Sequence, residues 1–69
     1  AEYASRYGLS AREQEIFSVI VQGMSNTEIA RALYITESTV KFHVGNIFKK
    51  TGFSSRLELI ADYRSKQSR

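Results

Sequence analysis

Apolar residues recur every three or four positions between residues 9 and 64, which is the spacing of one face of an α-helix. Short polar or glycine-containing stretches interrupt this pattern. The pattern predicts four helices, over about residues 11–22, 26–33, 37–51 and 55–64, and it lacks the alternation typical of a strand. The expected fold class is therefore all-α, a four-helix bundle around one core.

Residues that favour helix ends bracket the predicted helices. Three serines are each followed by a glutamate three residues later, the spacing of a capping box: Ser10 with Glu13, Ser25 with Glu28, and Ser55 with Glu58. Thr36 can cap the third helix, and Gly23 and Gly52 can take the left-handed conformation that closes a helix. The second helix has about two turns and reaches the third through a tight turn at Tyr34 and Ile35, an arrangement typical of a helix-turn-helix.

The predicted core comprises the apolar residues on the inner faces of these helices and in the turns between them. They are Leu9, Ile16, Phe17, Val19, Ile20, Ile29, Ala30, Leu33, Ile35, Val40, Val44, Ile47, Phe48, Phe53 and Ile60. A chain of 69 residues forms one small domain and buries only about 60% of its unfolded surface. We therefore expect modest stability and no deep catalytic pocket.

The predicted third helix has an apolar face and an exposed face. At about 100° per residue, the apolar face holds Val40, Val44, Ile47, Phe48 and Thr51. The opposite face holds Ser38, Phe42, Gly45, Asn46 and Lys49, with Lys41 on the flank. Exposing Phe42 has a cost that contact with a thymine methyl group would explain, and a neighbouring lysine can donate to guanine O6 and N7. The alternative for Phe42 is surface packing onto Ser38 or Asn46.

Charge is distributed unevenly along the chain, although the net charge is only +3 and the isoelectric point is near 9.5. Between Ser38 and Leu57 there is no acidic residue, and the basic ones are Lys41, Lys49, Lys50 and Arg56. A positive face of this kind suits nucleic acid, but a solvated surface is equally compatible with the charges alone. Arg12 and Arg56 have a structural alternative, an ion pair with Glu13, Glu15 or Glu58.

Composition argues against several classes of protein. The absence of cysteine excludes disulfides and cysteine-based metal sites and fits the cytoplasm, where we expect this domain to act. Apolar runs are far too short to span a membrane, so we expect no membrane contact by this domain, although a longer protein could be anchored elsewhere. His43 is the only histidine and lacks candidate partners for a metal ion or a catalytic triad. We therefore expect no enzyme, no catalytic residue, no metal and no cofactor.

Several motifs occur in the order and spacing of one known family. They are LSAREQEIF from Leu9, the G-x-S-N-x-E-I-A string from Gly23, ITESTVKFH from Ile35, NIFKKTG from Asn46 and SR from Ser55. From Leu9 to Ile60, about 50 of the 69 residues, the chain resembles the LuxR/GerE-type helix-turn-helix domain found at the C-terminus of many bacterial transcription regulators, including response regulators of the NarL/FixJ type. The resemblance implies sequence-specific binding of double-stranded DNA, with the third helix in the major groove.

Residue roles follow from this resemblance, motif position by motif position. Base reading falls on Lys41, Phe42 and Gly45. Phosphate binding falls on Thr27, Thr39, His43, Lys49 and Lys50, while Asn26 and Thr36 support helix ends. Simpler alternatives are a solubilising charge for Lys41, a surface position at the edge of the core for His43, and interaction of the last lysines with the negative end of the helix.

Two residues depart from the family pattern. Gly45 stands where the family often has lysine or arginine, and glycine inside a helix costs about 0.5 to 1 kcal/mol relative to alanine. Either the backbone approaches DNA closely there, or the protein reads fewer bases. Thr51 stands where leucine is usual, so we expect slightly weaker core packing.

The predicted fourth helix carries two stripes. By analogy with the family, Leu59, Ile60 and Tyr63 should face the core, while Leu57, Ala61 and Arg64 should form a two-fold dimer contact on DNA. The alternative for the second stripe is an apolar helix edge without a partner. Expected partners are double-stranded DNA and a second copy of the chain, with RNA polymerase as a further candidate.

The chain begins with Ala1 and not with methionine. We interpret residues 1–69 as one domain excised from the C-terminus of a longer regulator, with its core in 9–64 and a frayed tail at 65–69. The alternative function is a helical protein-protein interaction module that retains the helix-turn-helix fold. A basic face without acidic residues argues against that alternative.

Overall fold

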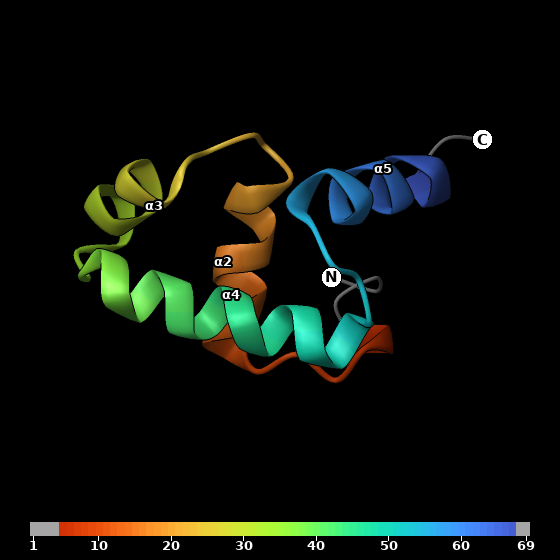
Figure 1. Cartoon of the computed structure of the whole chain (residues 1–69), viewed down its shortest axis with the longest axis horizontal. Coiled ribbons are helices and arrows are strands. Elements are labelled where there is room, and N and C mark those ends of the chain that lie inside the picture. The colour runs from red at the N-terminus through yellow and green to blue at the C-terminus, as the bar shows by residue number, and fades with distance from the viewer. Residues whose placement is uncertain (1–4, 68–69) are drawn as a thin grey trace.

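The computed structural model describes residues 5–67, most of which are helical and none of which lies in a strand. Four helices follow one another along this part of the chain: α2 (Ala11–Ile20), α3 (Asn26–Leu33), α4 (Glu37–Thr51) and α5 (Arg56–Gln67). In Figure 1, α4 crosses α2, and α3 and α5 lie toward opposite ends of the molecule. The predicted all-α bundle is therefore confirmed, and the predicted bounds of α3 and α4 are correct.

Capping boxes begin two of the helices, as predicted. Ser10 Oγ accepts from the Glu13 N–H (3.2 Å), and Glu13 Oε1 accepts from the Ser10 N–H (2.9 Å). At the start of α3, Ser25 and Glu28 make the same pair of bonds, at 3.2 and 2.8 Å. Each box satisfies backbone donors that the first helical turn leaves free.

The third predicted capping box forms only in part. Ser55 Oγ accepts from the Glu58 N–H (3.2 Å), but the Glu58 carboxylate accepts from Ser54, through its N–H (2.9 Å) and its hydroxyl (3.0 Å). The backbone hydrogen bond from Ser54 lowers the pKa of Glu58. The Glu58 carboxylate thus bonds to Ser54, the residue before the cap, and not to the backbone N–H of Ser55.

Two helix ends differ from the prediction. Helix α2 stops at Ile20, two residues early, because Gly23 has a φ of 94° and its N–H bonds to the Ile20 carbonyl (2.9 Å), which closes the turn. Helix α5 continues to Gln67, so the prediction of a frayed tail is wrong for residues 65–67. Lys66 pairs with Asp62 one turn earlier, at 2.9 Å, which supports the extra turn. The rest of that tail, residues 68–69, lies outside the described residues.

Tyr34 ends α3 in the left-handed conformation, with φ 58° and ψ 44°. The Ile35 N–H then bonds to the Ala30 carbonyl (3.0 Å), and the chain enters α4 at once. A left-handed tyrosine is strained by its Cβ, and because the Tyr34 side chain is 94% exposed, its packing does little to offset that strain. The turn predicted at Tyr34 and Ile35 is confirmed.

The core lies where α2, α3 and α4 meet, and α5 closes one side of it. Its buried apolar residues are Leu9, Ile16, Phe17, Ile20, Ile29, Ala30, Val40, Val44, Ile47 and Leu59. The other residues predicted for the core pack against this cluster but are only partly buried: Val19, Leu33, Ile35, Phe48, Phe53 and Ile60. The radius of gyration, 11.3 Å, is close to the value of about 11 Å expected for a compact domain of this length. Within residues 5–67, none of the helices combines the length and apolar character needed to cross a bilayer.

Candidate nucleic-acid interface

The outer face of α4 is exposed and basic. Lys41 and Lys49 are exposed, and the Phe42 side chain is 66% exposed. On the opposite face Val40, Val44 and Ile47 are buried. The predicted division of this helix into a core face and a solvent face is therefore confirmed.

One flank of α4 carries three of the residues predicted to bind phosphate. Thr39, His43 and Lys50 follow one another at intervals of four and seven residues, which places them on one side of the helix. Lys41 lies about half a turn away, on the other flank. Lys49 lies between the two flanks, on the crest of the exposed face.

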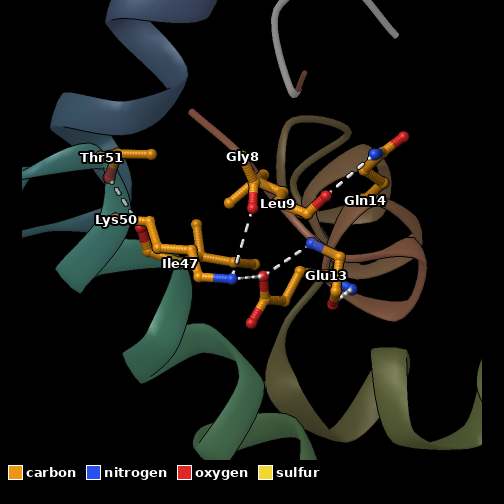
Figure 2. Close-up of polar contacts among 8 residues, drawn as sticks. Gly8, Leu9, Glu13, Gln14, Ile47, Lys50 and Thr51 are labelled. Atoms are coloured by element: carbon orange, nitrogen blue, oxygen red, sulfur yellow. Dashed lines mark hydrogen bonds and ion pairs between the residues drawn. The ribbon is translucent and has the colours of Figure 1, made fainter. Parts of the chain in front are cut away.

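Lys50 is held by an ion pair that the sequence did not predict. Its Nζ lies 2.7 Å from Glu13 Oε1 and 3.4 Å from the Gly8 carbonyl oxygen (Figure 2). Glu13 is only 5% exposed, and the bond from Lys50, followed by the backbone bond from Ser10, lowers the pKa of its carboxyl group. The pair joins the last turn of α4 to the first turn of α2.

Threonine hydroxyls bond at both ends of α4, and Gly52, with a φ of 82°, closes its C-terminal end as predicted. Thr36 Oγ1 accepts from the Thr39 N–H (3.1 Å) and lies 3.0 Å from Thr39 Oγ1, so Thr36 caps the helix as predicted. Thr51 donates to the Ile47 carbonyl (2.9 Å) and accepts from the Phe53 N–H (3.4 Å). Figure 2 shows the first of these Thr51 bonds. Both hydrogen-bonding roles of the Thr51 hydroxyl, donor and acceptor, are thereby filled. The leucine usual in the family at this position would offer only apolar packing.

The starts of α3 and α4 are linked by a hydrogen bond. Thr27 Oγ1 donates to Glu37 Oε2 at 2.9 Å, and both side chains are exposed. Glu37 is the acidic residue in the first turn of α4. The resemblance assigns the Thr27 hydroxyl to a DNA phosphate, but this hydroxyl already donates to the Glu37 carboxylate. Thr27 would have to exchange this partner to bind a phosphate.

Arg56 joins the start of α5 to the start of α3. Its Nη1 donates to the Met24 carbonyl (2.8 Å), and its Nη2 donates to Asn26 Oδ1. Arg56 thus has a structural role, as in the alternative reading, but its partners are a carbonyl and an amide and not a carboxylate, whereas Arg12 does pair with Glu15 at 3.1 Å. Burial lowers the pKa of Arg56. Asn26, the first residue of α3, thus accepts a hydrogen bond from the start of α5.

The Phe42 ring packs against the His43 ring. The two ring centroids are 5.4 Å apart and the rings are nearly perpendicular. The His43 ring is partly buried, and its Nδ1 is buried without a hydrogen-bond partner. This contact leaves most of Phe42 exposed, so packing within the protein does not account for its presence on the surface.

Helix α5 presents its two stripes as predicted. Leu59 is fully buried, Ile60 and Tyr63 are partly buried, and the Tyr63 ring lies edge-on to Phe17 with centroids 5.4 Å apart. On the other side Ala61 and Arg64 are exposed, and Leu57 is 78% exposed. The inward assignment is confirmed, and the outer stripe is available to a partner.

These observations define a class of protein. A two-turn helix, a tight turn and a longer helix with a basic outer face form a helix-turn-helix, and α2 and α5 support it from behind and from the side. A family model described as bacterial regulatory proteins of the luxR family matches residues 7–61. The chain therefore belongs to the luxR family of bacterial regulatory proteins.

Individual relatives agree with the family match. The chain is 52% identical over 50 residues to the nitrate/nitrite response regulator protein NarL of Escherichia coli, covering 72% of this chain and 23% of that protein. It is 45% identical over 53 residues to the CsgBAC operon transcriptional regulatory protein of the same species, covering 77% and 24%. Spore germination protein GerE of Bacillus subtilis is 36% identical over 61 residues, covering 88% and 82%. The chain thus spans about a quarter of the length of the first two relatives and most of the third.

Proposed function

We propose that this chain is a sequence-specific, double-stranded DNA-binding domain and the output module of a bacterial transcription regulator, with α4 in the major groove. The observation that carries the proposal is the exposed face of α4, where two free lysines and a largely exposed phenylalanine stand with no acidic residue beyond the first turn. An α-helix fits the major groove, and cations on its surface are attracted to the phosphates on either side. The names of the relatives, which include transcriptional regulators, support the same function.

Residues of α3 and α4 have separate proposed roles. Lys41, Phe42 and Gly45 read base edges from the crest and one flank. A second set of residues binds the phosphates of the DNA backbone: Thr27, Thr39, His43, Lys49 and Lys50. Lys50 remains in this set because its side chain is 39% exposed beside its ion pair with Glu13. Asn26 and Thr36 fix the helix ends that carry these groups.

The exposed stripe of α5 is the proposed dimer contact. Leu57, Ala61 and Arg64 form a patch too small for a standard interface of about 1,600 Å², so DNA has to hold the two copies in place. A further proposed partner is RNA polymerase, and the proposed place of action is the cytoplasm. A protein-protein interaction module is the alternative, and the acid-free basic face of α4 favours DNA over it.

A salt titration tests the proposal. Affinity for a mixed-sequence duplex should fall steeply as salt rises, with a slope of about −0.9 for each phosphate neutralised. Replacing Lys49, which makes no described contact within the protein, by alanine should reduce the slope by about one such step. Fluorescence anisotropy of a labelled duplex measures the affinity of the wild type and of the Lys49→Ala variant at each salt concentration.

Two results would contradict the proposal. One is the absence of duplex binding at low salt, and the other is an affinity that does not change with salt. Either result would favour the protein-protein interaction module.

A further inference from the structure

The fold of the domain does not explain why a glycine occupies position 45, on the exposed face of α4. The φ of Gly45 is not among the positive values found at Gly8, Gly23 and Gly52. A Cβ added at Gly45 would meet nothing within 4 Å. Glycine inside a helix is less stable than alanine, so the fold would gain from a side chain here. The use of glycine at this position therefore points to something outside the chain.

The neighbours of Gly45 on the helix surface are an aromatic ring and two cations. Lys41, Phe42 and Lys49 are four residues before, three before and four after Gly45, so all three border it on the helix surface. The Phe42 ring is largely exposed and lies edge-on to His43. The missing side chain thus leaves an open space, the Gly45 recess, beside an exposed aromatic ring and between two cations.

We propose that this recess receives the 5-methyl group of a thymine, so that Phe42 and Gly45 together specify one T·A base pair. The inference rests on the proposed function, in which α4 lies in the major groove. Of the four bases, thymine alone presents a methyl group in that groove. Phe42 contacts the methyl group from one side, and Gly45 lets the backbone approach it without a clash. The ammonium groups of Lys41 and Lys49 do not supply this preference, because they are attracted to phosphates and to acceptors on the bases and not to a methyl group.

The first experiment removes the methyl group from the DNA. The 69-residue protein selects duplexes from a pool randomised over about 20 base pairs, enough for two half-sites one helical turn apart. Each thymine of a selected duplex is then replaced by deoxyuridine, which lacks only the 5-methyl group. At one position of each half-site the substitution should weaken binding about fourfold, equivalent to about 0.8 kcal/mol for one buried methyl-sized group.

The second experiment adds a methyl group to the protein. Gly45→Ala should place its own methyl group in the recess, so the variant should bind the thymine duplex more weakly than the wild type and prefer the uracil duplex. Phe42→Ala should lose the preference without reversing it. Lys49→Ala is the matched control, and it should weaken both duplexes while retaining the preference for thymine. Gly45→Ala should also raise the Tm by about 2 to 8 °C, because alanine stabilises the helix.

The results separate this inference from the proposed function. If Gly45→Ala keeps the wild-type preference for thymine, or if it lowers the Tm, the recess does not read a methyl group and the inference is overturned. The inference is also overturned if the wild type enriches duplexes but no replacement of thymine by deoxyuridine weakens binding. In that case the proposed DNA binding still stands. If the wild type enriches no duplex, both proposals fail.

Discussion

At the scale of single residues, Glu13 shows how one side chain can serve two elements. Its carboxylate completes the capping box of α2 and also receives Lys50 from the end of α4. Such a buried carboxylate is tolerated because its partners replace the hydrogen bonds that water would make. A group outside the proposed DNA-binding face thus contacts the helix that carries that face.

Glu13→Gln should destabilise the domain by about 1 kcal/mol near neutral pH, the difference between charged and neutral hydrogen bonds. The pKa of Glu13 in the folded protein lies below its ordinary value of 4.5. The contribution of the carboxylate is therefore complete above that value and is lost as the pH falls through the lower, folded pKa. Urea unfolding of both proteins across this range should show the difference disappearing in acid.

Glu28→Gln is the control for this experiment. Glu28 makes the same capping box at α3, but it is exposed and has no described ion pair. Its replacement should cost less than that of Glu13. Equal losses for the two variants would show that capping, and not the bond to Lys50, accounts for the effect.

Lys41 and Lys49 should respond differently to replacement, because one is assigned to bases and the other to phosphates. Lys41→Ala should reduce the discrimination between a selected duplex and mixed-sequence DNA by about 1 to 3 kcal/mol. Lys49→Ala should weaken both about equally. Lys50 is unsuitable for this comparison because its loss would also break the pair with Glu13. Similar behaviour of the two variants in competition binding would refute the division of roles.

At the scale of elements, α5 illustrates how burial distinguishes residues of similar chemistry. Leu57 and Leu59 are two residues apart, yet one is 78% exposed and the other is fully buried. Successive helical residues turn by about 100°, so this spacing places the two leucines on different faces. The helix therefore supplies one leucine to the core and leaves the other on the surface.

Leu59→Ala should lower the free energy of unfolding by about 2 to 5 kcal/mol, because it removes buried apolar contacts and leaves a cavity. Leu57→Ala should change it by no more than about 0.5 kcal/mol. Denaturant unfolding monitored by circular dichroism compares the two variants. A large loss for Leu57→Ala would mean that the exposed stripe supports the fold.

At the scale of the whole molecule, one face of the domain is assigned to DNA and another to a second copy. Helix α4 supplies the first face, and the outer stripe of α5 supplies the second. Two-fold pairing through α5 requires inverted half-sites on the DNA, with centres about 10 base pairs apart. The arrangement allows weak protein contacts to act once both copies are bound.

Leu57→Asp should abolish cooperative occupancy of such a palindrome and leave the affinity for a single half-site nearly unchanged, since the residue lies outside the α4 face. Gel-shift titrations of duplexes with one and with two half-sites measure the two affinities. Unchanged cooperativity in the variant would exclude Leu57 from the dimer contact.

The sequence by itself determined the helices and their faces. Capping at Ser10, Ser25 and Thr36 and the periodic apolar positions are local properties, because residues three or four apart meet on any helix. For the same reason the exposed positions of Lys41 and Phe42 followed from helical geometry alone. The length of α5 was missed because its last turn is polar and held by the pair of Asp62 with Lys66, where no apolar period marks a helix.

Only the tertiary structure decided which distant residues meet. Glu13 and Lys50 are 37 residues apart, and Asn26 and Arg56 are 30 apart, so no local spacing relates them. Their contacts depend on how α2, α3, α4 and α5 pack, and each polar group takes the partner that packing brings within reach. The sequence therefore established what each helix presents, and the packing of the helices determined which of those groups are engaged within the protein and which remain free for DNA.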